Sequence, residues 1–358
     1  MTPEPRVLIR DRAPAPAGLA ERFWSESIER FEAAAAGRLL ERDLVIAGLS
    51  VRLSFAGPAM YEAVFPAFEH LVRRGSAEPE RRVLIWDAAS TGVKAPDAIW
   101  SETDLGPHGE VLSLGKGSIH AAADGWGRLL AYDPRSGTLV YHASDAALFP
   151  WHEYAAPMRS GLHWLLTGSG RHLIHGAAVG EGGRGLLVTA PSGSGKSTLA
   201  AACFCAGLDT AADDFVVVTL DGAPRAHSLY ATAKLDRGSV ELLAPDPSLI
   251  TNPGFSGDEK AVLDLRGGPI VPELPLSGIV VPRLTGASTP VLARIGAAEA
   301  LRQIGPSSLV VMPRPRGPAL ATAAELARRL PAWRLDLGGD LEAAVDSLRG
   351  LLRAEVAA

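Results

Sequence analysis

One glycine-rich segment, Leu186-Leu-Val-Thr-Ala-Pro-Ser-Gly-Ser-Gly-Lys-Ser-Thr-Leu199, constrains the fold of this chain more than any other feature. It joins an apolar run typical of a buried strand to a stretch with a helical pattern. The residues between them follow the P-loop pattern G-x-x-x-x-G-K-[ST], with Ala190 in place of the leading glycine. The segment therefore predicts an α/β fold with a P-loop at residues 190–197.

The spacing of this segment matches what phosphate binding requires. Two glycines let the backbone curl so that successive N–H groups point into one concavity, to which the helix N-terminus adds a partial positive charge. Lys196 would reach the β- and γ-phosphates, and the Ser197 hydroxyl would ligate Mg²⁺. A glycine turn with an incidental lysine is the alternative, but it does not explain the match in both sequence and context. The predicted ligands are ATP and Mg²⁺, held by Ser192, Gly193, Ser194, Gly195, Lys196, Ser197 and Thr198.

Two adjacent carboxylates, Asp213 and Asp214, open the apolar run at residues 215–219. Phosphate transfer to a hydroxyl needs one carboxylate to hold the metal and another to accept the proton of the attacking group. Adjacent side chains on an extended backbone point in opposite directions, so we expect the two to do different jobs. We assign Asp213 as the metal ligand and Asp214 as the base; the alternative is a solvated turn that carries two acids.

A histidine and the few lysines supply further candidates. His175 lies in the apolar run at residues 173–179, where a lone histidine is more often a core residue than a catalyst. Neighbouring strands could nevertheless bring it beside the aspartates, where it would tune the base. Lysine occurs only at positions 94, 116, 196, 234 and 260, so 30 of the 35 basic residues are arginine (35 − 5) and a retained lysine gains functional weight.

The bulk composition narrows the class of protein. With 358 residues, 47% of them hydrophobic and 21% charged, the chain is long enough for two domains. A formal charge of −5 gives no electrostatic footprint for nucleic acid or for an anionic membrane. No apolar run approaches the roughly 20 residues that cross a bilayer, and residues 1–6 do not lead into a signal peptide, so we expect a cytoplasmic protein.

The order of the patterns predicts a β-rich N-terminal domain at residues 1–150 and a P-loop catalytic domain at residues 151–358. The first domain either recognises the substrate or covers one side of the second. Its expected elements are a helix at 19–40, strands at 51–55 and 83–86, and a hairpin at 129–142. In the second domain we expect a helix at 158–166, strands at 172–179 and 186–189, and a helix at 196–206. Strands on either side of 221–224 and a proline-rich stretch at 243–290 should follow. A helix at 291–304 and a helix, strand and helix across 319–352 complete the expected order.

Taken together, His175-Gly176, the P-loop and Ala212-Asp-Asp214 resemble the HPr serine kinase family, whose fold is related to that of phosphoenolpyruvate carboxykinase. The resemblance covers residues 173–219. It implies a serine kinase in which Lys196 and Ser197 bind phosphate and Mg²⁺, the two aspartates share metal binding and base duty, and the histidine supports them.

The resemblance has limits that point to a divergent branch. The downstream glycine motif with glutamate and arginine is missing, so HPr as substrate and phosphorolysis do not carry over. Some HPr-kinase-like proteins belong to lasso-peptide biosynthesis and phosphorylate the C-terminal serine of the precursor. In that branch Lys260, in Gly257-Asp-Glu-Lys-Ala261, would be the further phosphate-neutralising cation and is grouped with the catalytic residues, with Lys234 a weaker candidate. An exposed lysine in a charged turn explains Lys260 equally well.

Three other functions share the P-loop. An ABC-type ATPase does not fit, because the chain has neither an LSGGQ-like signature nor a late apolar strand that ends in Asp-Glu. A kinase for free serine or a similar small molecule would have the same catalytic parts. A non-catalytic nucleotide sensor would need the loop but no base. The favoured prediction is a kinase for a serine of a peptide or protein; the acceptor, the phosphoryl donor and the oligomeric state stay open.

Overall fold

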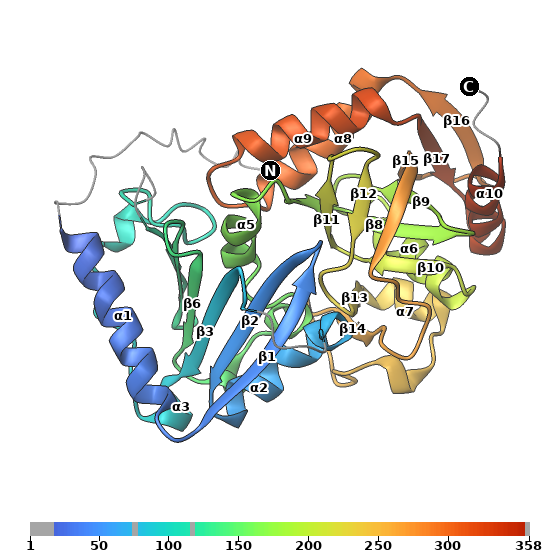
Figure 1. Ribbon diagram of the computed structural model, residues 1–358. Helices are drawn as coiled ribbons and strands as arrows, with labels where there is room; N and C mark the ends of the chain where they lie inside the picture. The colour runs from blue at the N-terminus through green and yellow to red at the C-terminus, as the bar shows by residue number, and fades with distance from the viewer. Residues whose placement is uncertain (1–17, 74–77, 115–118, 355–358) are drawn as a thin grey trace.

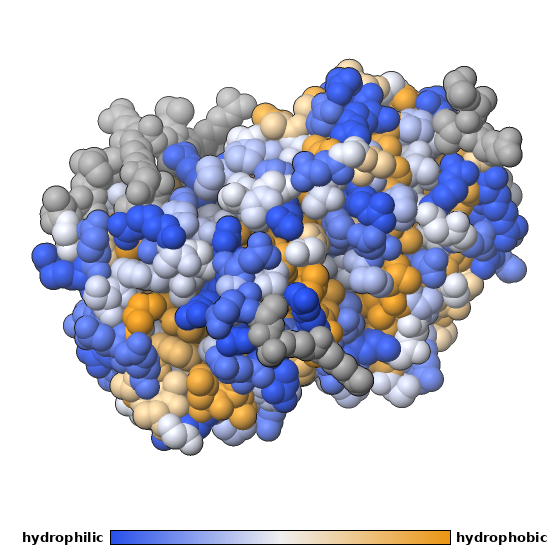
Figure 2. Space-filling model, in the orientation of Figure 1, coloured by the Kyte–Doolittle hydropathy of each residue, from blue (hydrophilic) through white to orange (hydrophobic). Residues whose placement is uncertain are grey.

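The chain is a mixed α/β protein with several β-sheets (Figure 1). The computed structural model describes residues 18–73, 78–114 and 119–354. Hydrophilic residues predominate on the face in Figure 2, and hydrophobic ones gather in small patches between them. None of the helices in these ranges is both long and apolar enough to cross a membrane.

The first sheet is built from the N-terminal part of the chain and has the strand order β1-β2-β3-β6-β5-β4. Its parallel pairs, β2 with β3 and β3 with β6, lie between antiparallel pairs at both edges. The hairpin expected at 129–142 is confirmed as β5 and β6. The strands are β1 (Leu39–Ile46), β2 (Leu49–Ala56), β3 (Arg81–Asp87), β4 (His120–Ala123), β5 (Arg128–Asp133) and β6 (Thr138–Ala143).

Helices cover both faces of this sheet. On one face α1 packs through Phe23 and Phe31, and on the other α2 and η1 pack through Met60 and Phe68. The helical elements of this part are α1 (Leu19–Ala35), α2 (Pro58–Val64), η1 (Phe65–Leu71), α3 (Ala88–Thr91), η2 (Glu102–Asp104) and η3 (Ala146–Leu148). The helix expected at 19–40 is wrong at its end, because Gly37 turns the chain with φ +73° and β1 follows.

The second sheet has nine strands and contains the predicted P-loop strand near its centre. Its path is β10-β8-β9-β15-β12-β11-β7, with β17 paired to β15 and β16 paired to β17. The strands are β7 (His172–His175), β8 (Ala177–Glu181), β9 (Arg184–Val188), β10 (Asp209–Ala212), β11 (Phe215–Thr219), β12 (Arg225–His227), β15 (Glu273–Leu284), β16 (Val291–Ile295) and β17 (Ala332–Leu337). A separate two-stranded sheet pairs β13 (Thr232–Leu235) with β14 (Ala261–Asp264).

Each face of the nine-stranded sheet has its own core. Side chains alternate along β9, so Leu186 and Val188 pack with α6 and α10, whereas Leu187 packs with α8 and α9. The remaining helical elements are α4 (Trp151–Ala155), α5 (Arg159–Thr167), α6 (Lys196–Cys205), α7 (Arg237–Leu243), η4 (Pro247–Leu249), α8 (Ala297–Val310), α9 (Gly317–Arg329) and α10 (Leu341–Arg353). The helix, strand and helix expected at 319–352 are confirmed.

Three expected elements differ from the structure. The single strand expected at 172–179 is two strands broken at Gly176, because β7 pairs with β11 while β8 pairs with β9 and β10. The proline-rich stretch contains the twelve-residue β15, and the helix expected at 291–304 begins instead with strand β16 before α8. Pro275 and Pro282 make a strand hard to predict here from the sequence. Pairing with β9, β12 and β17 nevertheless holds β15 in the sheet.

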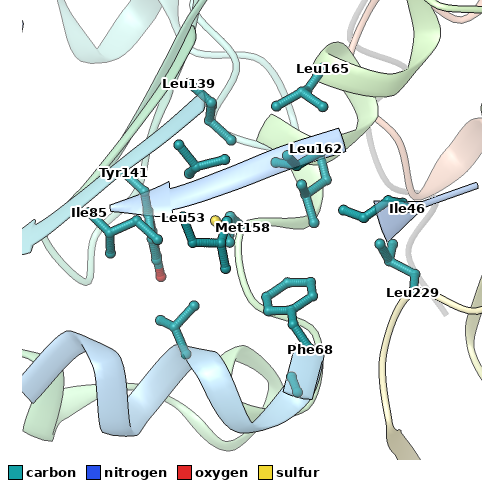
Figure 3. Close-up of a cluster of buried hydrophobic side chains, with 14 of the residues drawn as sticks. Ile46, Leu53, Phe68, Ile85, Leu139, Tyr141, Met158, Leu162, Leu165 and Leu229 are labelled. Atoms are coloured by element: carbon teal, nitrogen blue, oxygen red, sulfur yellow. The ribbon is translucent and has the colours of Figure 1, made fainter. Parts of the chain in front are cut away.

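One hydrophobic cluster joins the N-terminal sheet to the rest of the molecule (Figure 3). Leu162 and Leu165 of α5 lie against Leu139 of β6, and the cluster continues to Leu173 of β7 and Phe215 of β11. These buried contacts hold the start of α5 between the two large sheets. The division into domains at residue 150 stays a prediction, since the cluster is continuous across it.

Candidate functional site

The glycine loop, residues 190–195, connects β9 to α6. Gly193 and Gly195 have φ of +78° and +89°, in the left-handed region that glycine adopts without strain. A Cβ on Gly195 would lie 2.7 Å from Cδ1 of Leu337, so this position also lacks room for a side chain. The helix α6 then begins at Lys196 without a side-chain cap, which leaves its first amides free.

A cavity of about 320 Å³ opens over this loop. Of the predicted phosphate-binding residues it contains all but Ser194, whose Oγ is buried without a hydrogen-bond partner among the described residues. Lys196 lines the cavity although the residue is almost entirely buried, at 6% exposed. The described lining residues are His175, Pro191, Ser192, Gly193, Gly195, Lys196, Ser197, Thr198, Asp214, Lys234, Asp236, Gly238, Ser239, Leu242, Lys260, Leu284, Leu337, Gly338 and Leu341.

Asp214 and His175 meet at the wall of this cavity, because β7 and β11 pair with His175 opposite Phe215. Nε2 of His175 lies 3.3 Å from Oδ1 of Asp214. Nδ1 of the same histidine is buried and has no hydrogen-bond partner among the described residues. The strand pairing therefore supplies the juxtaposition that the sequence could only suggest.

The backbone at the aspartate pair is not extended, which corrects the premise from which opposite side-chain directions were expected. Asp214 has φ +67°, and the amide of Phe215 donates to the carbonyl of Asp213 at 2.8 Å, which closes a tight three-residue turn. The carbonyl of Asp214 accepts from the amide of Gly176 at 3.1 Å. As a result both carboxylates reach the same neighbour, Lys234 of β13.

Lys234 contacts both aspartates. Its Nζ forms an ion pair with Oδ2 of Asp214, and its backbone amide donates to Oδ2 of Asp213 at 3.2 Å. The side chain is 13% exposed and lies over the ring of Phe215, with Nζ 5.7 Å from the centroid. Sequence reasoning ranked Lys234 below Lys260, although the scarcity of lysine was a signal that applied to both.

The two aspartates differ in their electrostatics. Burial alone would raise the pKa of Asp214, but the charge of Lys234 and the hydrogen bond from His175 outweigh it and hold that pKa well below its ordinary value. Burial raises the pKa of Asp213 above its ordinary value, although the charge of Lys196 partly offsets this. Asp214 is therefore ionised at neutral pH and lines the cavity. Asp213 is 2% exposed, is not among the described lining residues, and leaves Oδ1 without a hydrogen-bond partner.

The other predicted residues lie around the same cavity. The hydroxyl of Thr198 is 2.7 Å from that of Ser239, which ties the start of α6 to α7. Lys260 precedes β14 and is fixed through its carbonyl, which accepts from Nδ2 of Asn252 at 2.9 Å. Its side chain lines the cavity together with Lys196 and Lys234, so three of the five lysines meet here.

The donor set suits a magnesium nucleotide rather than a metal held by protein alone. No group of three or more His, Cys, Asp or Glu side chains suited to a metal exists among the described residues. Mg²⁺ is ordinarily bound by one or two protein oxygens together with phosphate oxygens and water. The Ser197 hydroxyl and the free amides at the start of α6 fit such a group, whereas Asp213, the predicted metal ligand, is not among the described residues that line the cavity.

Comparisons with known proteins add little to this geometry. No protein-family model matches the chain, and no curated protein matches its sequence. Among solved structures, the chain is similar to the HPr(Ser) kinase/phosphatase from Coxiella burnetii, at 11% identity over 50% of this chain and 95% of that one, with a TM-score of 0.29. At that TM-score the similarity carries no argument about fold or activity, so the proposals below rest on the residues of the site.

Proposed function

We propose that the chain is a kinase that transfers the γ-phosphate of Mg²⁺-ATP to a hydroxyl group, most simply the serine hydroxyl of a peptide or protein. One observation carries this proposal: the ionised carboxylate of Asp214 lines the same cavity as the glycine loop and Lys196. A nucleotide sensor needs the loop alone, whereas phosphate transfer also needs an acidic group beside the reacting phosphate.

The donor side of the cavity consists of the glycine loop, Lys196 and Ser197. The free amides of the loop and helix would cradle the phosphates, and Lys196 would neutralise the β and γ oxygens. A Mg²⁺ held by the Ser197 hydroxyl together with phosphate oxygens and water would stabilise the charge that develops on the phosphates. At the outer end of the cavity Leu242 and Leu284, which are 57% and 61% exposed, offer an apolar surface for the base of the nucleotide.

The acceptor side consists of Asp214 with its two cationic or polar neighbours, His175 and Lys234. Asp214 would orient the attacking hydroxyl and take its proton on Oδ1 or Oδ2. A carboxylate with a lowered pKa is a weak base, which suits a loose transition state in which the proton leaves late. His175 would fix the carboxylate through Nε2, and Lys234 would limit the repulsion between that carboxylate and the phosphates.

The acceptor is the open part of the proposal. By its resemblance to the lasso-peptide branch, the C-terminal serine of a precursor peptide is the first acceptor to test, and free serine is the second. Purified full-length protein would be incubated with Mg²⁺ and γ-labelled ATP together with serine peptides, serine proteins or free serine. We expect label to move to one class of acceptor.

Matched lysine variants make the result specific to the site. Lys196→Ala should abolish transfer, while Lys94→Ala, an exposed lysine in the N-terminal part, should leave it unchanged. ATP binding without transfer to any acceptor would instead identify a nucleotide sensor.

A further inference from the structure

A second cavity, of about 170 Å³, shares Lys234 with the first. Strands β4, β5 and β6 of the N-terminal sheet form one side of it, and α4 and the start of α5 form the other. Lys234 lines both cavities, so it lies between the second one and Asp214, with which it forms an ion pair in the first. The described lining residues are His108, Ala122, Ala123, Asp124, Arg128, Leu130, Tyr141, His152, Glu153, Ala156, Met158, Arg159, Ser160 and Lys234.

Both carboxylates in this second cavity already have partners from the chain itself. Asp124 accepts from Nε of Arg128 at 2.7 Å, and Arg128 also forms an ion pair with Glu153. Glu153 further accepts from the hydroxyl of Tyr141 at 2.7 Å and from the amide of Met158 at 2.8 Å. The acidic groups and Arg128 therefore satisfy one another.

Arg159 lines the second cavity and, unlike Arg128 and Lys234, has no carboxylate partner among the described residues. Its buried Nε has no hydrogen-bond partner in the part of the chain that the structure describes. Its guanidinium lies over the ring of Phe215, whose centroid is 5.1 Å from Cζ. A buried donor without a partner costs free energy, which a bound acceptor group would recover.

The start of α5 adds to the positive potential around Arg159. The helix begins at Arg159 without a side-chain cap, so its first amides have no helical partner. Ser160 also lines the cavity and is 8% exposed, with no hydrogen bond to its hydroxyl from the described residues. The guanidinium of Arg159, the hydroxyl of Ser160 and a helix N-terminus thus converge on one small space.

Phe215 links this space to the reacting groups. Its buried ring has Arg159 at 5.1 Å, Nζ of Lys234 at 5.7 Å and the ring of His175 at 5.5 Å, all measured to its centroid. A ligand whose charged end lies on Arg159 would therefore extend toward Lys234 and Asp214, where the hydroxyl must react.

We infer that the second cavity binds the acceptor through an anionic group, a carboxylate or a phosphate, held by Arg159, Ser160 and the start of α5. This inference rests on the proposed kinase function and names the class of its substrate: a hydroxyl compound that carries an anionic group close to the hydroxyl. The planar guanidinium suits both anions, because it can donate two parallel hydrogen bonds to either.

Paired probes test the inference and separate the two anions. Serine is compared with serine amide, a serine peptide with its C-terminal amide, and glycerol 3-phosphate with glycerol. Each pair keeps the hydroxyl and removes the charge. The wild-type protein should prefer the anionic member of at least one pair, and the pair that discriminates identifies carboxylate or phosphate.

Variants then assign the preference to Arg159. Arg159→Gln should raise KM for the anionic probe about 10- to 100-fold, as expected for a charge-assisted hydrogen bond, and leave KM for ATP unchanged. Arg159→Lys should recover part of the loss, since it keeps the charge but not the fork. Arg294→Gln is the matched control: its guanidinium lies 4.7 Å from the ring centroid of Trp333 and lines neither cavity.

Failure of this inference can be told from failure of the kinase proposal. If phosphate transfer occurs but Arg159→Gln affects charged and neutral probes equally, the anion subsite is wrong and the kinase stands. If no probe is phosphorylated, calorimetric binding of serine and of glycerol 3-phosphate decides. Binding that is weakened by Arg159→Gln and not by Arg294→Gln supports the subsite, and binding that is absent or equal in all three proteins overturns it.

Discussion

Nζ of Lys234 and Oδ2 of Asp214 form an ion pair in which both side chains are largely buried, at 13% and 17% exposed. The pair joins β13 to the turn between β10 and β11, and its lysine lines both cavities. Its charge compensation keeps Asp214 ionised beside the glycine loop. The same contact therefore supports the fold and, in our proposal, the chemistry.

Replacing Asp214 with asparagine should destabilise the protein. The change leaves the buried ammonium of Lys234 unpaired, and breaking a buried pair from one side costs about 3 kcal/mol or more. Denaturant unfolding at pH 7 measures this loss in the free energy of unfolding. Asp221→Asn, an exposed aspartate in the turn after β11, should change it by less than about 0.5 kcal/mol. Equal effects of the two variants would contradict the role of the ion pair.

The neighbouring aspartate should behave in the opposite way. Since the folded pKa of Asp213 is raised, its ionised form costs stability above the pKa of about 3.9 in the unfolded chain, and the cost is relieved as pH falls. Asp213→Asn should therefore raise the free energy of unfolding at pH 7, with the gain disappearing toward pH 4.

For Asp214, whose folded pKa is lowered, the stabilisation is present above the unfolded pKa and is lost as pH falls below it. Unfolding curves for both variants from pH 7 down to about pH 2 check the two signs.

A side chain at position 195 should damage nucleotide binding. Gly195→Ala forces an alanine into φ +89° and brings its Cβ to 2.7 Å from Cδ1 of Leu337, so either the loop or the buried Leu337 side chain must shift. Gly207→Ala is the control, because it has φ +80° but open space around the new Cβ. Fluorescence titration with a labelled ATP analogue should show weaker binding only for Gly195→Ala. Similar affinities in both variants would mean that the loop does not hold the phosphates.

The cluster under α5 should be needed for stability. Leu162 is fully buried between the two large sheets, and Leu162→Ala should cost about 2–5 kcal/mol through the cavity it leaves. Thermal or denaturant unfolding reports the change. Leu148→Ala, at a leucine that is 66% exposed, should have almost no effect. A small loss at Leu162 would show that the sheets are not coupled through this helix.

The glycine loop and its flanking strand and helix could be predicted because they are local. The apolar run, the glycines and the helix start lie within one short segment, and each follows from backbone preference alone. The position of His175 could not be derived in this way. It depends on the break at Gly176 and on the pairing of β7 with β11, which are long-range features.

The sequence was less informative about the remaining charges. Asp214 adopts a left-handed backbone although no glycine or proline lies next to it, so the extended backbone expected at the aspartate pair was wrong. The scarcity of lysine pointed to Lys234 and Lys260, but only the pairing of β13 with β14 decides what Lys234 reaches. Nothing in the sequence distinguished Arg159 from the other arginines. It stands out only in the structure, where its buried Nε has no hydrogen-bond partner among the described residues.

The most direct test of the account is the rate of phosphate transfer by Asp214→Asn at saturating Mg²⁺-ATP, measured in a single turnover beside the dissociation constant for the nucleotide. The account predicts a rate lower by about 10²- to 10⁴-fold with nucleotide affinity within a few-fold of wild type, because a lost base slows chemistry and spares phosphate binding. Retained affinity also shows that the variant is folded. Transfer at close to the wild-type rate would contradict the claim that Asp214 serves the reacting hydroxyl.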